Sequence, residues 1–190
     1  MNILSVDATG EVLSAAVGCV QIRRKSKKHD EALLPLVEAA LKKARLSWRD
    51  LDAVAAACGP GRFTGIRIGM SFAAAAGFQL KIPALAVSRL EAAAEKSGAE
   101  RVLAALPGWK GEVYHQVFRR LKPVGDAAWS VPADWPAARA AAEASGLPVA
   151  YGDVGAAELL PVARRLLAAR RVPPFKPLYL KPAGYERPRG

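Results

Sequence analysis

The chain has 190 residues and is poor in the residue types that build disulfide frameworks and metal sites. It contains two cysteines and two histidines, and none of them stands at the C-x-x-C or H-x-x-x-H spacing typical of zinc ligands. Cys19 and Cys58 are too few and too scattered for a disulfide framework, which favours a reducing compartment. We therefore expect no metal site and a cytoplasmic location.

Long apolar runs are also missing. The longest uncharged stretch, residues 68–80, includes Ser71 and Gln79 and is shorter than the roughly 20 residues that cross a bilayer. Residues 1–20 carry Asp7 and Glu11 and lack a basic start, so they do not resemble a secretory signal peptide. A buried helix is the better interpretation of residues 68–80, and we expect no membrane partner.

The motifs of common hydrolases are absent as well. There is no Gly-x-Ser-x-Gly elbow, and only His29 and His115 offer an imidazole base. His115 lies in the alternating run 113–118, which is typical of a strand, and is expected to be structural. His29 lies at a predicted helix start, where a structural role and a partner contact both stay open. A nucleophilic triad is therefore not predicted, and we assign no catalytic residue.

Acidic residues are scarce beside basic ones. The 17 Asp and Glu face 28 Lys and Arg, for a formal net charge of +11. Basic residues fill five of the six positions 23–28 and recur through residues 164–189. This pattern is consistent with a nucleic-acid partner and equally with a surface that is merely soluble. RNA-binding modules interleave aromatic residues with basic ones, and the basic tail contains Phe175, Tyr179 and Tyr185.

The most informative stretch that is present is residues 58–69, CGPGRFTGIRIG. It follows the apolar run 53–57 and precedes a long apolar segment, so a strand, a glycine turn and a helix are predicted. Thr64 is expected to cap that helix, whose start is a place where an anion or a partner's backbone can approach. A P-loop would end in Gly-Lys-Ser/Thr, and a dinucleotide fingerprint would read G-x-G-x-x-G. Neither spacing occurs.

Apolar periodicity predicts the same order of elements in both halves of the chain. Strands are expected at 3–6, 12–17, 20–24, 53–57 and 84–87, with helices near 30–44, 64–80 and 88–97. The second half repeats this order in reduced form, with strands at 101–106, 112–119 and 148–151, a poorly defined third segment, and helices at 134–146 and 156–169. This is an α/β pattern of two lobes, residues 1–98 and residues 99–190, the second ending in a proline-rich basic tail.

Local signals fix some of the predicted boundaries. Ser88 and Glu91 form a predicted capping box, and Gly98 is expected to end that helix. Pro35 is compatible with the first long helix only near its first turn or at a kink.

The glycine stretch resembles Gly-Pro-Gly-Ser-Phe-Thr-Gly-Ile-Arg-Ile-Gly, the signature of the bacterial TsaB family, formerly called YeaZ. Four further segments are similar to landmarks of that family: ILSVDAT at 3–9, HDEALLP at 29–35, GEVY at 111–114 and PLYLK at 177–181. The resemblance implies the actin-like ATPase (ribonuclease-H-like) fold. It also implies a non-catalytic accessory subunit that binds and activates a TsaD-type transferase in the synthesis of threonylcarbamoyladenosine at position 37 of tRNA.

The chain departs from this family pattern in four places. Arg62 replaces the usual serine, Pro-Gly-Trp at 107–109 replaces Asp-Ala-Arg, the segment 16–29 is short, and the net charge is high. The loss of Asp-Ala-Arg puts a ligand role of the second lobe in doubt. We expect no tightly bound cofactor, and ATP or ADP is an option only at the interface with the catalytic partner.

The resemblance and the residue pattern together name three sets of site residues. The nucleotide set comprises Asp7, Thr9, Gly10, Gly59 and Gly61. The partner set lies on the helices that begin near residues 30 and 64 and comprises His29, Leu33, Val37, Ala40, Phe63, Ile66, Arg67, Met70, Ala73, Ala74 and Gly77. The tRNA-phosphate set comprises Arg164, Arg165, Arg170 and Arg171. The alternatives are an Asp7 that only closes its own turn and helix faces that are simply core.

The implied partners are the TsaD-type paralogue, a TsaE-type ATPase in the assembled complex, and tRNA bound through that complex. A homodimer of the free chain stays open. Two other functions compete with this one: a small actin-fold hydrolase or kinase-like enzyme of the glycoprotease type, and a general basic RNA-binding module. ATP turnover by the chain alone would favour the first, and tight tRNA binding without a protein partner would favour the second.

Overall fold

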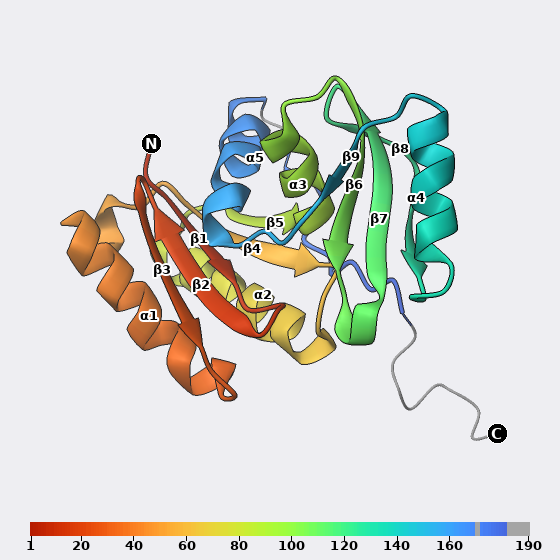
Figure 1. The fold of residues 1–190 in the computed structure, drawn as a ribbon. Helices are drawn as coiled ribbons and strands as arrows, with labels where there is room; N and C mark the ends of the chain where they lie inside the picture. The colour runs from red at the N-terminus through yellow and green to blue at the C-terminus, as the bar shows by residue number, and fades with distance from the viewer. Residues whose placement is uncertain (170–171, 182–190) are drawn as a thin grey trace.

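The computed structural model describes residues 1–169 and 172–181, which form two sheets with helices on their faces (Figure 1). The five-stranded sheet has the order β3-β2-β1-β4-β5, with bounds β1 Ile3–Asp7, β2 Val12–Val17, β3 Val20–Lys25, β4 Ala53–Gly59 and β5 Ala84–Ser88. β1 pairs antiparallel with β2 and parallel with β4, and β4 pairs parallel with β5. β1 and β4 are buried along their whole length, as expected of strands covered on both faces.

The four-stranded sheet has the order β8-β7-β6-β9. Its strands are β6 Arg101–Pro107, β7 Val113–Arg119, β8 Lys122–Ser130 and β9 Val149–Tyr151. β6 pairs antiparallel with β7 and parallel with β9, so this sheet repeats the order of the first one without its last strand. The predicted fold class, two similar α/β lobes with the second reduced, is confirmed.

The α-helices are α1 His29–Ala44, α2 Phe63–Leu80, α3 Arg89–Ser97, α4 Trp135–Ala144 and α5 Ala156–Ala168, with short 3₁₀ helices η1 Trp48–Asp50 and η2 Trp109–Gly111. α1 and α2 cover one face of the five-stranded sheet, whereas α5 and α3 lie on its opposite face, between the two sheets (Figure 1). α4 lies on the outer face of the second sheet. None of the helices within the described residues combines the length and the apolarity that a membrane span requires.

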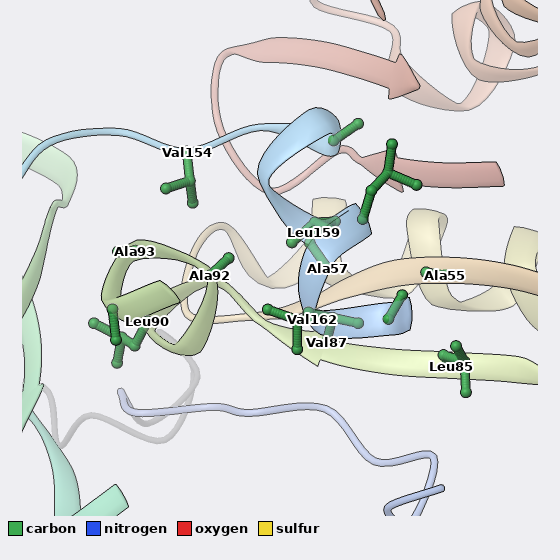
Figure 2. Close-up of a cluster of buried hydrophobic side chains, with 14 of the residues drawn as sticks. Ala55, Ala57, Leu85, Val87, Leu90, Ala92, Ala93, Val154, Leu159 and Val162 are labelled. Carbon is green, nitrogen blue, oxygen red and sulfur yellow. The ribbon is translucent and has the colours of Figure 1, made fainter. Parts of the chain in front are cut away.

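Two apolar cores hold these layers together. One joins α1 and α2 to the five-stranded sheet. The other lies between the sheets, where Figure 2 shows Leu159 and Val162 of α5 over Ala57 of β4 and Val87 of β5. This second core also takes Phe118 and other side chains from the second sheet. The predicted domain boundary at residue 98 stays a prediction, and the apolar interior runs across it.

Some local predictions are confirmed and others are wrong. Gly98 ends α3 with a φ of +67°. Ser88 Oγ accepts a hydrogen bond from the Glu91 N–H at 3.4 Å, which is one half of the predicted capping box, whereas the Glu91 carboxylate bonds to Arg165 instead. Helix α2 begins at Phe63 with Arg62 as its N-cap residue, and no side chain caps it. The prediction that Thr64 caps α2 is therefore wrong, because Thr64 lies inside the first turn. Pro35 lies within α1, beyond the first turn and on the exposed side of the helix.

Candidate functional site

The turn that follows β1 is closed by its own side chains. Asp7 Oδ1 accepts hydrogen bonds from the Thr9 backbone N–H at 2.8 Å and from Thr9 Oγ1 at 2.7 Å. Both residues are at least 98% buried. An Asp that accepts from the backbone two residues on is the usual Asx turn, so the first carboxylate oxygen of Asp7 serves the turn itself.

Arg89 takes the other carboxylate oxygen and joins three distant segments. Its Nε donates to Asp7 Oδ2 at 3.0 Å, its Nη1 to the Pro60 carbonyl at 3.0 Å, and its Nη2 to the Val154 carbonyl at 3.0 Å and to the Asp153 carboxylate. The Arg89 side chain is 4% exposed. A planar guanidinium presents five N–H donors in a rigid fork, which suits one residue to bind the first turn, the glycine turn and the link to α5 together.

The glycine stretch brings α2 close to the same turn. A Cβ on Gly61 would lie 2.6 Å from the Thr9 Cβ, and a Cβ on Gly65 would overlap the Ala8 carbonyl oxygen. The Arg62 N–H donates to the Thr9 carbonyl at 2.8 Å. The backbone that lies against these glycines therefore belongs to Ala8 and Thr9 of the same chain and not to a partner. We call this end of the five-stranded sheet, formed by Asp7–Thr9, Gly59–Gly65 and Arg89, the closed end.

Residues 172–181, which we call the strap, cover the closed end. The Leu178 N–H donates to the Cys58 carbonyl at 2.7 Å, and the Leu178 carbonyl leaves no room for a Cβ on Gly59. Farther along, Lys181 Nζ lies 2.6 and 2.7 Å from the two carboxylate oxygens of Glu112. The strap therefore joins β4 of the first sheet to the start of β7 in the second. Burial under it raises the pKa of the Cys58 thiol to about 12.

The predicted nucleotide set is thus brought together but enclosed. Asp7 and Thr9 bond to each other and to Arg89, and Gly59 and Gly61 are covered by the strap and by Thr9. Gly10, which follows in the turn, is less crowded, because a Cβ there would meet only the Val12 nitrogen at 3.9 Å. Among the described residues, no group of three or more His, Cys, Asp and Glu side chains is placed to hold a metal ion.

Most of the predicted partner set belongs to the chain's own core. Seven of its side chains are buried against the five-stranded sheet: Leu33, Val37, Ala40, Ile66, Met70, Ala73 and Gly77. They have no surface to offer a partner. Only Phe63, Arg67 and Ala74 are exposed, and Arg67 lies 5.2 Å from the centroid of the Phe63 ring. The sequence reasoning missed the exposed apolar residues of the same helices, Leu34 and Phe78, which are 48% and 87% exposed.

The two histidines have structural partners. His29 Nδ1 lies 3.0 Å from the Ala8 carbonyl, and His29, the first residue of α1, is buried. His115 Nε2 lies 2.8 Å from Ser130 Oγ, and burial lowers the pKa of His115. These contacts agree with the structural interpretation of His115.

The predicted tRNA-phosphate set is only partly described. Arg164 is exposed. Arg165 is bound by the carboxylates of Glu91 and Glu95 on α3, at 2.7 and 3.0 Å. Burial alone would lower the pKa of Arg165, but the hydrogen bonds and charges of Glu91 and Glu95 together outweigh it and raise that pKa. Its charge is thus already neutralised within the chain. Arg170 and Arg171 lie outside the described residues.

Arg89 is a further residue that sequence reasoning missed. It is the first residue of α3, and a cation at a helix N-terminus is disfavoured by the helix dipole. A charge in that position needs a carboxylate partner. This signal was available in the sequence, although nothing there identified Asp7 and Asp153 as the partners.

Comparison with known proteins identifies the relatives of this chain. The family model of tRNA N6-adenosine threonylcarbamoyltransferase, TsaD, matches residues 6–157. The tRNA threonylcarbamoyladenosine biosynthesis protein TsaB of Escherichia coli is 36% identical over 129 residues, which are 63% of this chain and 56% of that protein. The chain therefore matches little more than half the length of this relative.

Two solved structures from Pseudomonas aeruginosa share the fold almost throughout. A protein described as similar to the peptidase YeaZ superposes with a TM-score of 0.75 at 25% identity, over 95% of this chain and 99% of that one. A second structure, YeaZ itself, gives a TM-score of 0.72 at 25% identity, over 94% and 99% of the two chains. The chain belongs to the TsaD family of tRNA N6-adenosine threonylcarbamoyltransferases, within its TsaB (YeaZ) group.

Proposed function

We propose that this chain is an accessory subunit that binds and activates a TsaD-type threonylcarbamoyl transferase in the modification of tRNA. Its membership of the TsaB group supports this role, as does its E. coli relative, whose name places it in threonylcarbamoyladenosine biosynthesis. We place the complex in the cytoplasm and assign the chain no activity of its own.

The observation that carries the proposal is the closed end. Ligands of open α/β sheets usually bind at the carboxyl ends of the parallel strands. In this chain that position is taken by Arg89, which binds Asp7, the Pro60 carbonyl and the Asp153 carboxylate. An enzyme of the hydrolase or kinase class would need a reachable acid, base or metal site there. ATP turnover by the purified chain would favour that rival function.

The surface we assign to the catalytic partner is the exposed side of α1 and α2. It carries Leu34 on α1 and Phe63, Ala74 and Phe78 on α2. Burying a large apolar side chain contributes about 1.5–3 kcal/mol, so two or three such residues offset a substantial part of the cost of association. Single exposed apolar residues are common, but several on two neighbouring helices indicate an interaction surface.

Co-purification of the chain with a TsaD-type paralogue from the same cell tests this assignment. Phe78→Glu and Leu34→Glu should each weaken the complex at least tenfold, since about 1.4 kcal/mol corresponds to one decade of affinity. Val124→Glu is the matched control, because Val124 is 50% exposed on β8 of the other lobe. Circular dichroism should show all three variants folded. Complexes that tolerate both helix variants as well as the control would contradict the proposed surface.

Further partners follow from the same proposal. A TsaE-type ATPase and tRNA are expected to join the heterodimer, and ATP or ADP, if bound, is expected at the interface between the two paralogues. A homodimer of the free chain would use the same apolar side of α1 and α2. Light scattering of the free chain, and of the chain mixed with its paralogue, would therefore show the homodimer giving way to the heterodimer.

A further inference from the structure

The end of the five-stranded sheet opposite the closed end carries a group of exposed cations. β1, β4 and β5 are parallel and begin at this end. α1 and α2 connect to the starts of later strands and therefore finish here. We call this group the basic end; its members are Lys42, Lys43, Arg45, Arg49 and Lys81.

Contacts between elements hold the basic end together. η1, which contains Arg49, lies between the end of α1 and the start of β4. The neighbouring Trp48 ring packs 6.3 Å from the Phe72 ring of α2. Lys81 directly follows α2, and the Pro83 carbonyl accepts a hydrogen bond from the Val54 N–H at the start of β4. The five cations therefore lie on segments that meet at the end of the sheet where β4 and β5 begin.

The charge of the basic end is not neutralised within the described residues, where none of its five side chains forms an ion pair. The nearby carboxylates have other partners. Asp50 accepts from the backbone and side chain of Ser47, and these bonds lower its pKa. Asp52 accepts from the Asn2 N–H at 2.6 Å. Glu38, one turn before Lys42 on α1, is the exception, because within the described residues it forms no ion pair with Lys42 or with any other cation. Cations therefore outnumber acids at this end.

Two of the five cations stand at backbone positions that favour another residue. Arg45 and Lys81 end α1 and α2 with φ angles of +57° and +56°, where glycine is the usual residue. The chain does use glycine at the end of α3, where Gly98 has a φ of +67°. A cation near a helix C-terminus gains about 0.3–1 kcal/mol from the dipole, which explains one cation on each helix and leaves the others unexplained.

We propose that the basic end binds RNA phosphates, specifically those of the tRNA held by the assembled complex. The inference rests on the proposed function for the identity of the RNA. It is argued from charge and from continuity with the proposed partner surface: Leu34, Glu38 and Lys42 follow one another at intervals of one turn along α1, and Lys81 follows Phe78 by three residues. RNA bound to the partner would therefore continue onto the basic end.

The test compares two charge-matched triple variants in the full chain, alone and with the TsaD-type paralogue. One is Lys42→Gln, Lys43→Gln, Lys81→Gln. The control is Arg101→Gln, Arg119→Gln, Lys122→Gln, which removes from the second lobe three exposed cations that form no ion pair within the described residues. The probe is a fluorescent unmodified tRNA transcript, and the dissociation constant is measured against salt concentration. Each lost phosphate contact should flatten the log–log slope by about 0.7–0.9.

We expect the first triple variant to flatten the slope by about 2 and to weaken binding equally for different tRNA sequences, since phosphate contacts carry no sequence information. The control should leave the slope unchanged. Equal losses in both variants would mean bulk charge only and would overturn the proposal, as would an unchanged slope in both.

Two further measurements separate the possible failures. Binding to anionic phosphatidylglycerol vesicles that the first variant loses, with the tRNA slope intact, would assign the basic end to a lipid surface instead. Size-exclusion chromatography reports heterodimer formation independently. A chain that never associates with its paralogue overturns the proposed function, whereas a heterodimer that forms with an unaltered tRNA slope overturns only the role of the basic end.

Discussion

The two ends of the five-stranded sheet differ in how their polar groups are used. At the closed end, Asp7, Thr9 and Arg89 are buried and bond to one another and to the backbone. At the basic end, the cations are exposed and form no ion pair with any carboxylate in the part of the chain that the structure describes. The polar groups of the closed end hold the fold together, whereas the cations of the basic end remain available to a partner.

This difference teaches that a fold does not fix where a function lies. In open α/β sheets the carboxyl ends of the strands form the usual ligand crevice. In this chain the same place holds a guanidinium, three glycines under close backbone contact and the strap. The groups that remain available for partners lie on the helix faces and at the opposite end of the sheet.

The largest expected effect comes from removing the cation of the closed end. Arg89→Met leaves the buried Asp7 carboxylate without its charged partner, which should lower the free energy of unfolding by about 3–5 kcal/mol. The matched control is Arg120→Met, whose ion pair with Glu100 is solvent-exposed and should cost no more than about 1 kcal/mol. Urea denaturation measures both.

A second variant keeps that test informative if Arg89→Met does not fold. Arg89→Lys retains the charge but loses the planar fork, so its stability should lie between those of the wild type and the Met variant. Equal stability of the Arg89 and Arg120 variants would mean that the buried Arg89 contributes no more to the free energy of unfolding than a surface ion pair does.

A smaller effect is expected from filling the glycine contact. Gly65→Ala places a Cβ on the Ala8 carbonyl oxygen, and relieving such an overlap typically costs about 1–3 kcal/mol. Gly10→Ala is the control, since its Cβ would meet only the Val12 nitrogen at 3.9 Å and should change stability by less than about 0.5 kcal/mol. Thermal melts that shift equally in the two variants would contradict the close approach of α2 to the Ala8 backbone.

The reactivities of the two cysteine thiols report on the two ends of the sheet, and measuring them requires no substitution that would alter stability. Cys58 lies beneath the strap, and its raised pKa of about 12 keeps it a protonated thiol at every pH below that value. Cys19 is exposed in the turn between β2 and β3, beside the start of β1. A disulfide reagent such as Ellman's reagent at pH 8 should therefore modify one thiol in the native protein and both after unfolding. Rapid modification of Cys58 in the native state would show that the closed end opens.

Much of the fold could be predicted from the sequence because the signals were local. The apolar stripe of α1, the alternation in β7 and the glycine that ends α3 each reflect residues close together in the chain. The element order in both lobes followed from them. The start of α2 was misplaced because Thr64 looked like a cap, whereas the contact of the Arg62 N–H with the Thr9 carbonyl sets the turn.

The site was harder to predict because its contacts are distant in the sequence. Asp7 could be identified as an acid after the first strand, but Arg89 lies 82 residues away. The apolar stripes of α1 and α2 were identified, but periodicity alone could not say which side of a stripe faces a sheet and which faces solvent. As a result, Val37 and Ile66 were assigned to a partner although they are core, and Phe78 was missed.

The measurement that tests the central claim most directly is a calorimetric titration of the isolated chain with Mg²⁺ and ATP. If Arg89 and the strap close the carboxyl end of the sheet, the wild-type chain should give no saturable heat of binding. The same titration of the heterodimer shows separately whether the paralogue binds nucleotide. Stoichiometric binding of ATP to the isolated chain at low micromolar affinity would contradict the account.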